Sequence, residues 1–243
     1  MAHLGERLEP GAQPKAIALR LLPAGIGPGL AQVAALRGHA GAQPGAERAD
    51  WGQAAKVQPI PSKYPFVDAL TYFARALGAA RSGDPASAES DAQQLAVLRD
   101  ALRTAKNEYW ATEVEVSRLG AAAWAAWARG KHEEALGLMR SAADMEDKSE
   151  KHIVTPGRLV PARELLADML LELKRPAEAL KEFEASQTRE PDRFRGLYGA
   201  AQAAAQSGDT AKAKRYFARL VDIAGEGSPR PELVGARNFL SAN

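Results

Sequence analysis

Four short turns recur along the chain, and each is followed by a helix start and then by an alanine at the same place. They are RSGDPASAE, ARGKHEEAL, ELKRPAEAL and QSGDTAKAK, at residues 81–89, 128–136, 172–180 and 206–214. The shared alanines are Ala88, Ala135, Ala179 and Ala213, so successive offsets are 47, 44 and 34 residues. A helix–turn–helix unit that recurs at this spacing indicates a helical repeat array, in which each unit buries its apolar face against neighbouring units.

The turns carry residues that begin and end helices. Asp84 and Asp209 can cap the second helix of their units, because a carboxylate accepts hydrogen bonds from unpaired backbone N–H groups. Pro85 and Pro176 fall at the first helical position, where the missing N–H has no intrahelical partner to lose. The end of the first helix favours a positive φ, which suits Gly83, Gly130 and Gly208. In the third unit Lys174 takes the place of that glycine.

The predicted helices are amphipathic. In PARELLADMLLEL, at residues 161–173, Leu165, Leu166, Met169 and Leu170 follow helical spacing, and charged residues occupy the other side. The next helix places Phe183 four residues after Ala179, so an aromatic ring can fill the groove that the small alanine leaves between two helices. Abundant alanine and only 6% aromatic residues agree with helices packed through small side chains.

A compositional boundary separates residues 1–46 from the rest. This segment holds 8 of the 21 glycines and 5 of the 15 prolines. We predict an irregular or poorly ordered segment here, and the sequence leaves open whether it belongs to the repeat array. Gly25, Gly27 and Gly29 would allow a phosphate loop, but no strand precedes them and Pro28 interrupts the pattern.

From residue 47 the chain resembles the tetratricopeptide repeat (TPR) family, and it is similar to the C-terminal part of uncharacterised bacterial TPR proteins. The units at 160–193 and 194–227 carry the resemblance through Ala167, Ala179, Phe183, Pro191, Ala201, Gly208, Ala213 and Phe217. The units at 69–102 and 116–149 carry it through Tyr72, Ala76, Gly83, Ala88, Ala123, Gly130, Ala135 and Ala142. A truncated unit is expected near 49–57, within the repeats at 47–227, and a capping helix at 228–243. The resemblance implies an all-α, right-handed α-solenoid of antiparallel helix pairs.

In TPR arrays the first helix of each unit lines a concave groove that takes peptides or partner helices. The resemblance places in that groove Phe73, Leu77, Trp124, Trp127, Glu164, Asp168, Glu172, Tyr198 and Gln202. Such a groove would be apolar at one end and acidic at the other, with aromatic anchors for a partner. Two alternatives stay open, because the tryptophans can pack between helices and the acidic residues can simply face solvent.

Catalytic chemistry finds little support in the sequence. The four histidines form no metal-binding pair, and neither a G-x-S-x-G nucleophile elbow nor a calcium loop is present. With no cysteine, thiolate zinc sites and cysteine nucleophiles are excluded. EKHIVTPG, at residues 150–157, fits an enlarged joint between the second and third units, with Thr155 before Pro156, or else Pro161, at the start of the following helix. We therefore expect no enzyme, no cofactor and no metal.

Charge and hydropathy narrow the partners and the compartment. The chain has 32 Lys+Arg against 30 Asp+Glu without a basic stripe, so nucleic acid is not favoured. The longest apolar stretch, residues 119–128, is about half of the ~20 residues that span a bilayer. The N-terminus lacks the features of a signal peptide, which predicts a cytoplasmic protein, or a periplasmic one if the true N-terminus is missing.

The sequence therefore predicts a non-enzymatic helical-repeat scaffold that binds a protein or peptide of unknown identity. The alternative is an accessory domain of a larger enzymatic or regulatory system, or a helical enzyme whose site the sequence does not reveal.

Overall fold

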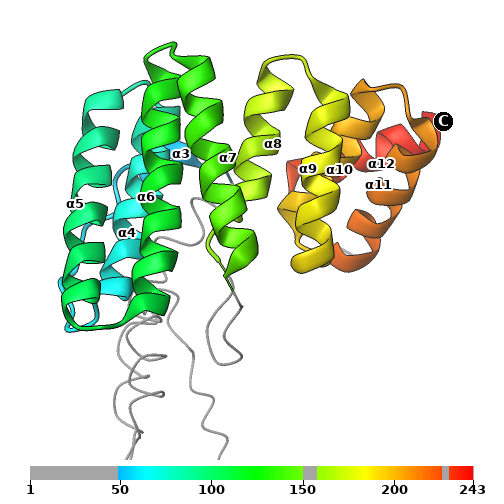
Figure 1. Ribbon diagram of the computed structural model, residues 1–243. Helices are drawn as coiled ribbons and strands as arrows, with labels where there is room; N and C mark the ends of the chain where they lie inside the picture. The colour runs from blue at the N-terminus through cyan, green and yellow to red at the C-terminus, as the bar shows by residue number, and fades with distance from the viewer. Residues whose placement is uncertain (1–48, 150–157, 226–229, 243) are drawn as a thin grey trace, which may run out of the picture.

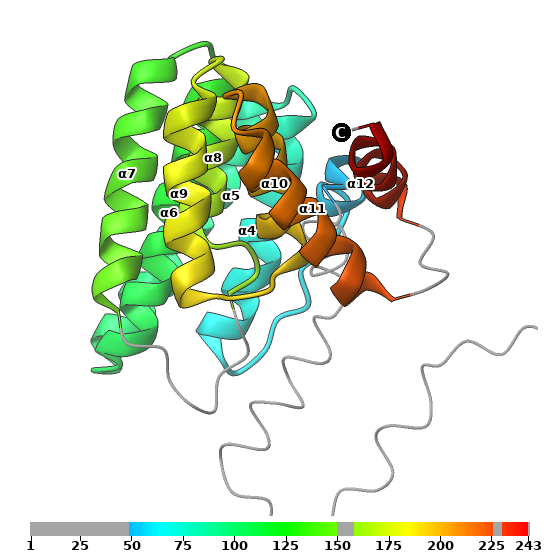
Figure 2. The same cartoon turned by 90° about the vertical axis from the view of Figure 1, so that its right-hand side faces the viewer.

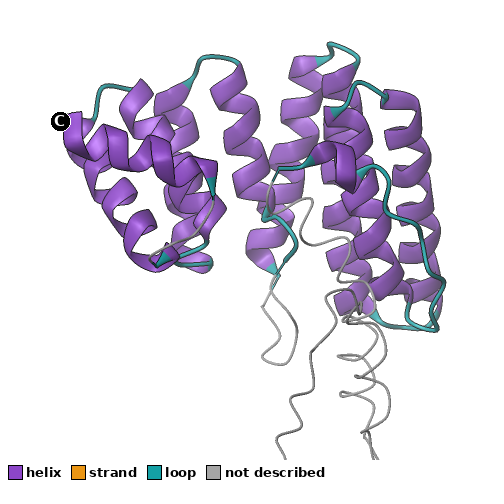
Figure 3. Ribbon diagram, turned by 180° about the vertical axis from the view of Figure 1, so that it is seen from behind, coloured by secondary structure: helices purple, strands orange, loops and turns teal. Residues whose placement is uncertain are grey.

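The computed structural model describes residues 49–149, 158–225 and 230–242, and regular structure within these ranges is entirely helical (Figure 3). Four helix pairs form the body of the molecule. They are α4 (Pro65–Arg81) with α5 (Pro85–Thr104), α6 (Glu108–Ala128) with α7 (His132–Lys148), α8 (Ala162–Glu172) with α9 (Pro176–Arg189), and α10 (Phe194–Gln206) with α11 (Thr210–Ala224). A short helix, α3 (Trp51–Ala54), precedes the pairs and α12 (Pro231–Ala242) follows them.

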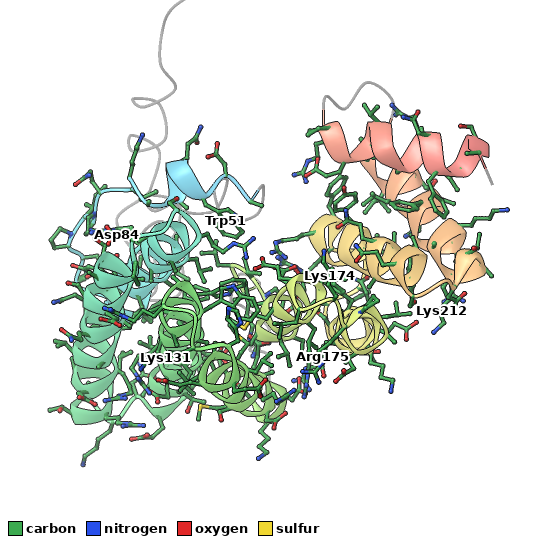
Figure 4. All side chains as sticks on the ribbon, turned by 90° about the horizontal axis from the view of Figure 1, so that it is seen from above. Trp51, Asp84, Lys131, Lys174, Arg175 and Lys212 are labelled. Carbon is green, nitrogen blue, oxygen red and sulfur yellow. The ribbon has the colours of Figure 1, made fainter. Side chains whose placement is uncertain are left out.

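The pairs stack in chain order into a solenoid (Figure 1). Each second helix packs against its own first helix and against the first helix of the next pair, and the first helices α4, α6, α8 and α10 contact one another in succession. Figure 2 and Figure 4 place α3 and α12 on the same side of the array as the first helices, whereas α7 and α9 lie on the opposite side. The predicted all-α solenoid of antiparallel helix pairs is confirmed.

The turns have the predicted local chemistry. Asp84 accepts a hydrogen bond from the backbone N–H of Ser87 at 3.0 Å, and Asp209 accepts one from Lys212 at 2.9 Å. Lys174 adopts a φ of 60°, although this left-handed conformation is unusual for a residue with a side chain. Glycines occupy the same place in the other turns, with positive φ at Gly83, Gly130 and Gly208.

Close approach between small and large side chains forms the core. The four repeat alanines, Ala88, Ala135, Ala179 and Ala213, are fully buried. Phe183 of α9 is fully buried against α10, where a Cβ built on Gly199 would lie 2.2 Å from the phenyl Cζ atom. Only a glycine at position 199 lets the ring pack this close to the α10 backbone, so Phe183 and Gly199 together set the spacing between the last two pairs.

Glycine also fixes α3 on the solenoid. A Cβ built on Gly78 of α4 would lie 2.2 Å from the backbone N of Ala55 and 2.7 Å from the carbonyl O of Trp51. The backbone of α3 therefore rests directly on α4, and the Trp51 side chain has a fixed place at the edge of the concave side (Figure 4).

Two segments that the sequence analysis singled out, residues 1–46 and EKHIVTPG at residues 150–157, lie outside the described residues. The predicted helix start at Thr155 and Pro156 lies outside them as well. The described helix begins instead at Ala162, directly after Pro161. The unit boundaries remain a prediction, as does the truncated unit near 49–57, where α3 has four residues. At the other end α12 buries Leu233 and Ala236.

We predict that Gly199→Ala lowers the free energy of unfolding by about 1–3 kcal/mol, because the added methyl group forces Phe183 out of its site. Gly137→Ala is the matched control. Gly137 lies on the exposed side of α7, where an added Cβ meets nothing within 4 Å, so this change should raise stability by about 0.5–1 kcal/mol. Urea denaturation followed by circular dichroism measures both, and equal stability of Gly199→Ala and the parent would contradict the packing described.

Candidate binding groove

A pocket of about 260 Å³ opens on the concave side of the solenoid, between the short helix α3 and the C-terminal helix α12. We call it the groove pocket. Helices α8 and α10 form its floor, and α3, the end of α4 and the start of α12 form its walls (Figure 4). Its main lining residues are Trp51, Arg81, Asp168, Leu171, Glu172, Phe194, Arg195, Tyr198, Gln202 and Glu232.

Helical spacing explains why α8 and α10 supply the floor. On α8, Asp168, Leu171 and Glu172 stand three and four residues apart, so they share one face, whereas the buried leucines of this helix occupy the other. On α10, Tyr198 and Gln202 are four residues apart, and the Gln202 amide donates a hydrogen bond to the Tyr198 hydroxyl at 3.0 Å. Each helix thus turns one face, which carries most of its polar residues, toward the pocket and the opposite face toward the core.

Arg81, at the end of α4, connects four elements around the pocket. Its guanidinium lies 4.3 Å from the ring centroid of Trp124 on α6 and 5.4 Å from that of Trp51 on α3. It also forms an ion pair with Glu172 on α8. A guanidinium between two indole rings gains cation–π attraction from both, which contributes about 0.5–2 kcal/mol for each contact. Arg81 therefore holds the wall formed by Trp51 against the floor.

Arg195 fixes the other side of the floor. Its guanidinium pairs with Asp168 on α8 and lies 3.7 Å from the carboxylate of Glu164, which is fully buried beneath the pocket. Glu164 is also 3.2 Å from Arg193. Removing one partner from such a buried group would leave an uncompensated charge, so this cluster locks α8 to α10.

The start of α12 closes the pocket beside Tyr198. Glu232 lies in the first turn of α12 and lines the pocket with Tyr198. Burial raises the pKa of the Tyr198 hydroxyl, and the negative charge of Glu232 raises it further. Both effects disfavour the phenolate, so Tyr198 is a neutral hydrogen-bonding group at this end of the pocket.

The structure separates the sequence-predicted groove residues into two sets. Asp168, Glu172, Tyr198 and Gln202 all line the groove pocket. Four others are buried in the core, namely Phe73, Leu77, Trp124 and Glu164. Trp127 is half-buried and its ring lies 4.4 Å from that of His132. The expected apolar end of the groove is therefore packed into the solenoid, and Trp124 supports the pocket from below through Arg81.

Among the lining residues that sequence reasoning missed are Trp51, Arg81, Phe194, Arg195 and Glu232. Phe194 and Arg195 stand four and three residues before Tyr198, so helical spacing would have found them if the groove face had been extended by one turn. The other three, Trp51, Arg81 and Glu232, come from elements outside the repeat positions that the family groove uses. These three residues are far apart in the sequence, so helical spacing cannot relate them, and only the curvature of the solenoid brings them together.

Titratable residues outside the pocket have a structural explanation. In the described ranges no three of His, Asp and Glu gather in a way that could hold a metal ion. Glu146 of α7 accepts a hydrogen bond from the backbone N–H of Ala162 at 2.9 Å and pairs with Arg158 at 3.0 Å. Because Ala162 is the first residue of α8, Glu146 serves as a cap for that helix at the joint between two pairs.

Comparison with known proteins supports the fold. No protein-family model matches the sequence, and no curated protein matches it significantly. Among solved structures, the chain is similar to the crystal structure of a Podospora anserina putative kinesin light chain with nearly identical TPR-like repeats, with a TM-score of 0.50 and 16% sequence identity. The match covers 75% of this chain and 87% of the other. At this identity the likeness shows the fold alone, which is a TPR-like helical-repeat fold.

None of the helices in the described part of the chain is long and apolar enough to cross a bilayer.

We predict that Glu146 makes stability fall as the pH rises from about 4.5 to about 7. Burial raises its pKa to about 7 from an ordinary 4.5, and the attraction of Arg158 offsets only part of this effect. The folded state then binds the proton more tightly than the unfolded state, so the stabilisation is complete below pH 4.5 and is lost through pH 7. Between these two pH values the contribution of Glu146 to the free energy of unfolding falls by about 3 kcal/mol.

Urea denaturation at several pH values, with Glu146→Gln beside the parent, measures this effect. The difference in unfolding free energy between the two proteins should change across the window, whereas Glu133→Gln, an exposed change on the same helix, should give a constant difference. A constant difference for Glu146→Gln as well would contradict the assignment.

Proposed function

We propose that this chain is a non-enzymatic helical-repeat protein that binds a protein or peptide through its concave face. The observation that carries the proposal is the groove pocket itself. It lies where the first helices of a repeat array face a partner, and five separate elements wall it. The similar solved structure is that of a putative kinesin light chain, and this name belongs to the other protein alone.

The lining of the pocket suits recognition of an extended segment. Aromatic residues from two elements border it, namely Trp51 of α3 and Phe194 and Tyr198 of α10. Rigid aromatic rings with polar groups beside them are the residues that most often dominate the energy of protein interfaces. The ion pairs of Arg81 and Arg195 hold the floor and one wall in place before a partner arrives, so little ordering is needed on binding.

The arrangement gives no support to a catalytic role for the pocket. General acid–base or nucleophilic catalysis needs a reactive group beside a base of suitable pKa. The carboxylates of Asp168 and Glu172 are instead committed to Arg195 and Arg81. Neither the pocket lining nor the described surroundings contains a histidine that faces them.

We predict that Tyr198→Ala weakens peptide binding at least tenfold while the protein stays folded, because it removes an aromatic surface that lines the pocket. A random peptide library displayed on phage and selected on the immobilised full chain supplies the ligands. Fluorescence anisotropy then measures the affinity of each selected peptide.

Tyr216→Ala is the matched control. Tyr216 is also half-buried, but it lies on the second helix α11 and donates a hydrogen bond to Glu184 at 2.8 Å. Peptides that bind the parent, Tyr198→Ala and Tyr216→Ala equally would show that recognition occurs elsewhere. A library that yields no binder would remove support for the scaffold function.

A further inference from the structure

One carboxylate of the groove pocket differs from the others in its pairing. Arg81 pairs with Glu172, and Arg195 pairs with Asp168. In the described ranges Glu232 forms no ion pair, and its Oε2 atom is shielded from solvent without a hydrogen-bond partner. A shielded carboxylate oxygen without a hydrogen-bond partner destabilises the folded protein, because it has lost its hydrogen bonds to water without replacing them. Glu232 therefore has an unused capacity to accept a hydrogen bond from a cation.

The nearest basic residue in the sequence does not fill this capacity. Arg230 stands two residues before Glu232, but its guanidinium lies over the ring of Phe194, 4.1 Å from the centroid. Arg230 thus covers the rim of the pocket rather than the Glu232 carboxylate. The charge of Glu232 nevertheless acts inside the pocket, because it helps to raise the pKa of Tyr198.

A second hollow in the molecule differs from the groove pocket in how its carboxylates are paired. It measures about 290 Å³ and lies between α5, α6 and α7, with alanines along much of its lining. Its carboxylates are paired, Glu89 with Arg129 and Glu134 with Lys131 at 3.2 Å. Both carboxylates that line the second hollow therefore have a cation beside them, whereas Glu232 in the groove pocket has none among the described residues.

We propose that the groove pocket receives a lysine or arginine side chain of a partner peptide, with Glu232 as the carboxylate that binds the cation. The proposal rests on the proposed function and adds the chemistry of the partner. Three carboxylates, Asp168, Glu172 and Glu232, line the pocket against the two guanidinium groups of Arg81 and Arg195, so a single added positive charge balances the lining.

Size and shape agree with this occupant. At about 260 Å³ the pocket is below the usual range of about 300–1,000 Å³ for sites that enclose a whole small molecule, and it suits one long side chain. The rings of Trp51, Phe194 and Tyr198 border the space, so they can pack against the aliphatic stem of a lysine or arginine side chain.

An acidic partner fits this lining poorly. A carboxylate or phosphate would meet the unpaired charge of Glu232, and it could reach Arg81 or Arg195 only by displacing Glu172 or Asp168. Because displacement would leave those carboxylates unpaired in a partly buried site, the electrostatic balance opposes acidic segments.

The phage selection described above supplies the test, with the full chain as bait. Peptides that depend on Tyr198 should share a lysine or arginine at one position. Replacing that residue by citrulline, which keeps the shape of arginine without its charge, should weaken binding at least tenfold. Glu232→Gln should weaken the basic peptide to a similar extent and should leave the citrulline peptide unchanged.

Glu133→Gln is the matched control, because Glu133 also lies in the first turn of a helix but is exposed on α7. Selected peptides that depend on Tyr198 but lack a basic residue would overturn this inference and leave the scaffold function standing. Equal binding of the arginine and citrulline peptides would overturn it too. Self-association of the chain in sedimentation velocity that Glu232→Gln abolishes would assign the pocket to a second copy instead.

Discussion

The close approach of helices through small residues is the constraint on which the rest of the structure depends. Fully buried alanines repeat at the start of the second helices, and Gly199 lets the ring of Phe183 pack against the backbone of α10. These contacts fix the spacing between neighbouring helices, and the spacing of first helices determines which of their faces meet across the concave side. Gly199 also lines the groove pocket, so the contact that brings α9 close to α10 lies beside the floor of the pocket.

Arg81 adds electrostatic contacts to this close packing of helices. Gly78 brings the backbone of α3 onto α4, and Arg81 then holds Trp51 through stacking while its charge reaches Glu172. A residue at the end of one helix thereby connects α3, α4, α6 and α8. Function and stability overlap in this contact, since the group that ties the elements together also forms part of the wall that a partner would touch.

Much of the fold could be predicted from the sequence because local rules govern it. Asp84 and Asp209 act as helix caps, and even the departure at Lys174 keeps the left-handed conformation that the turn requires. The candidate site was harder to predict. The resemblance to TPR arrays placed Tyr198 and Asp168 in the groove, but it could not tell an exposed tryptophan from a buried one, and Trp124 is only 1% exposed. Contributions from α3 and α12 depend on long-range curvature, which no local pattern encodes.

Hydrogen exchange followed by mass spectrometry, with and without a saturating selected peptide, shows which face of the solenoid the peptide covers. We expect slower exchange in α8, in α10 and in the first turn of α12, where the pocket lies, with no change in α7 and α9 on the opposite side. Protection confined to α5, α7 or α9, with α8, α10 and α12 unchanged, would contradict this expectation.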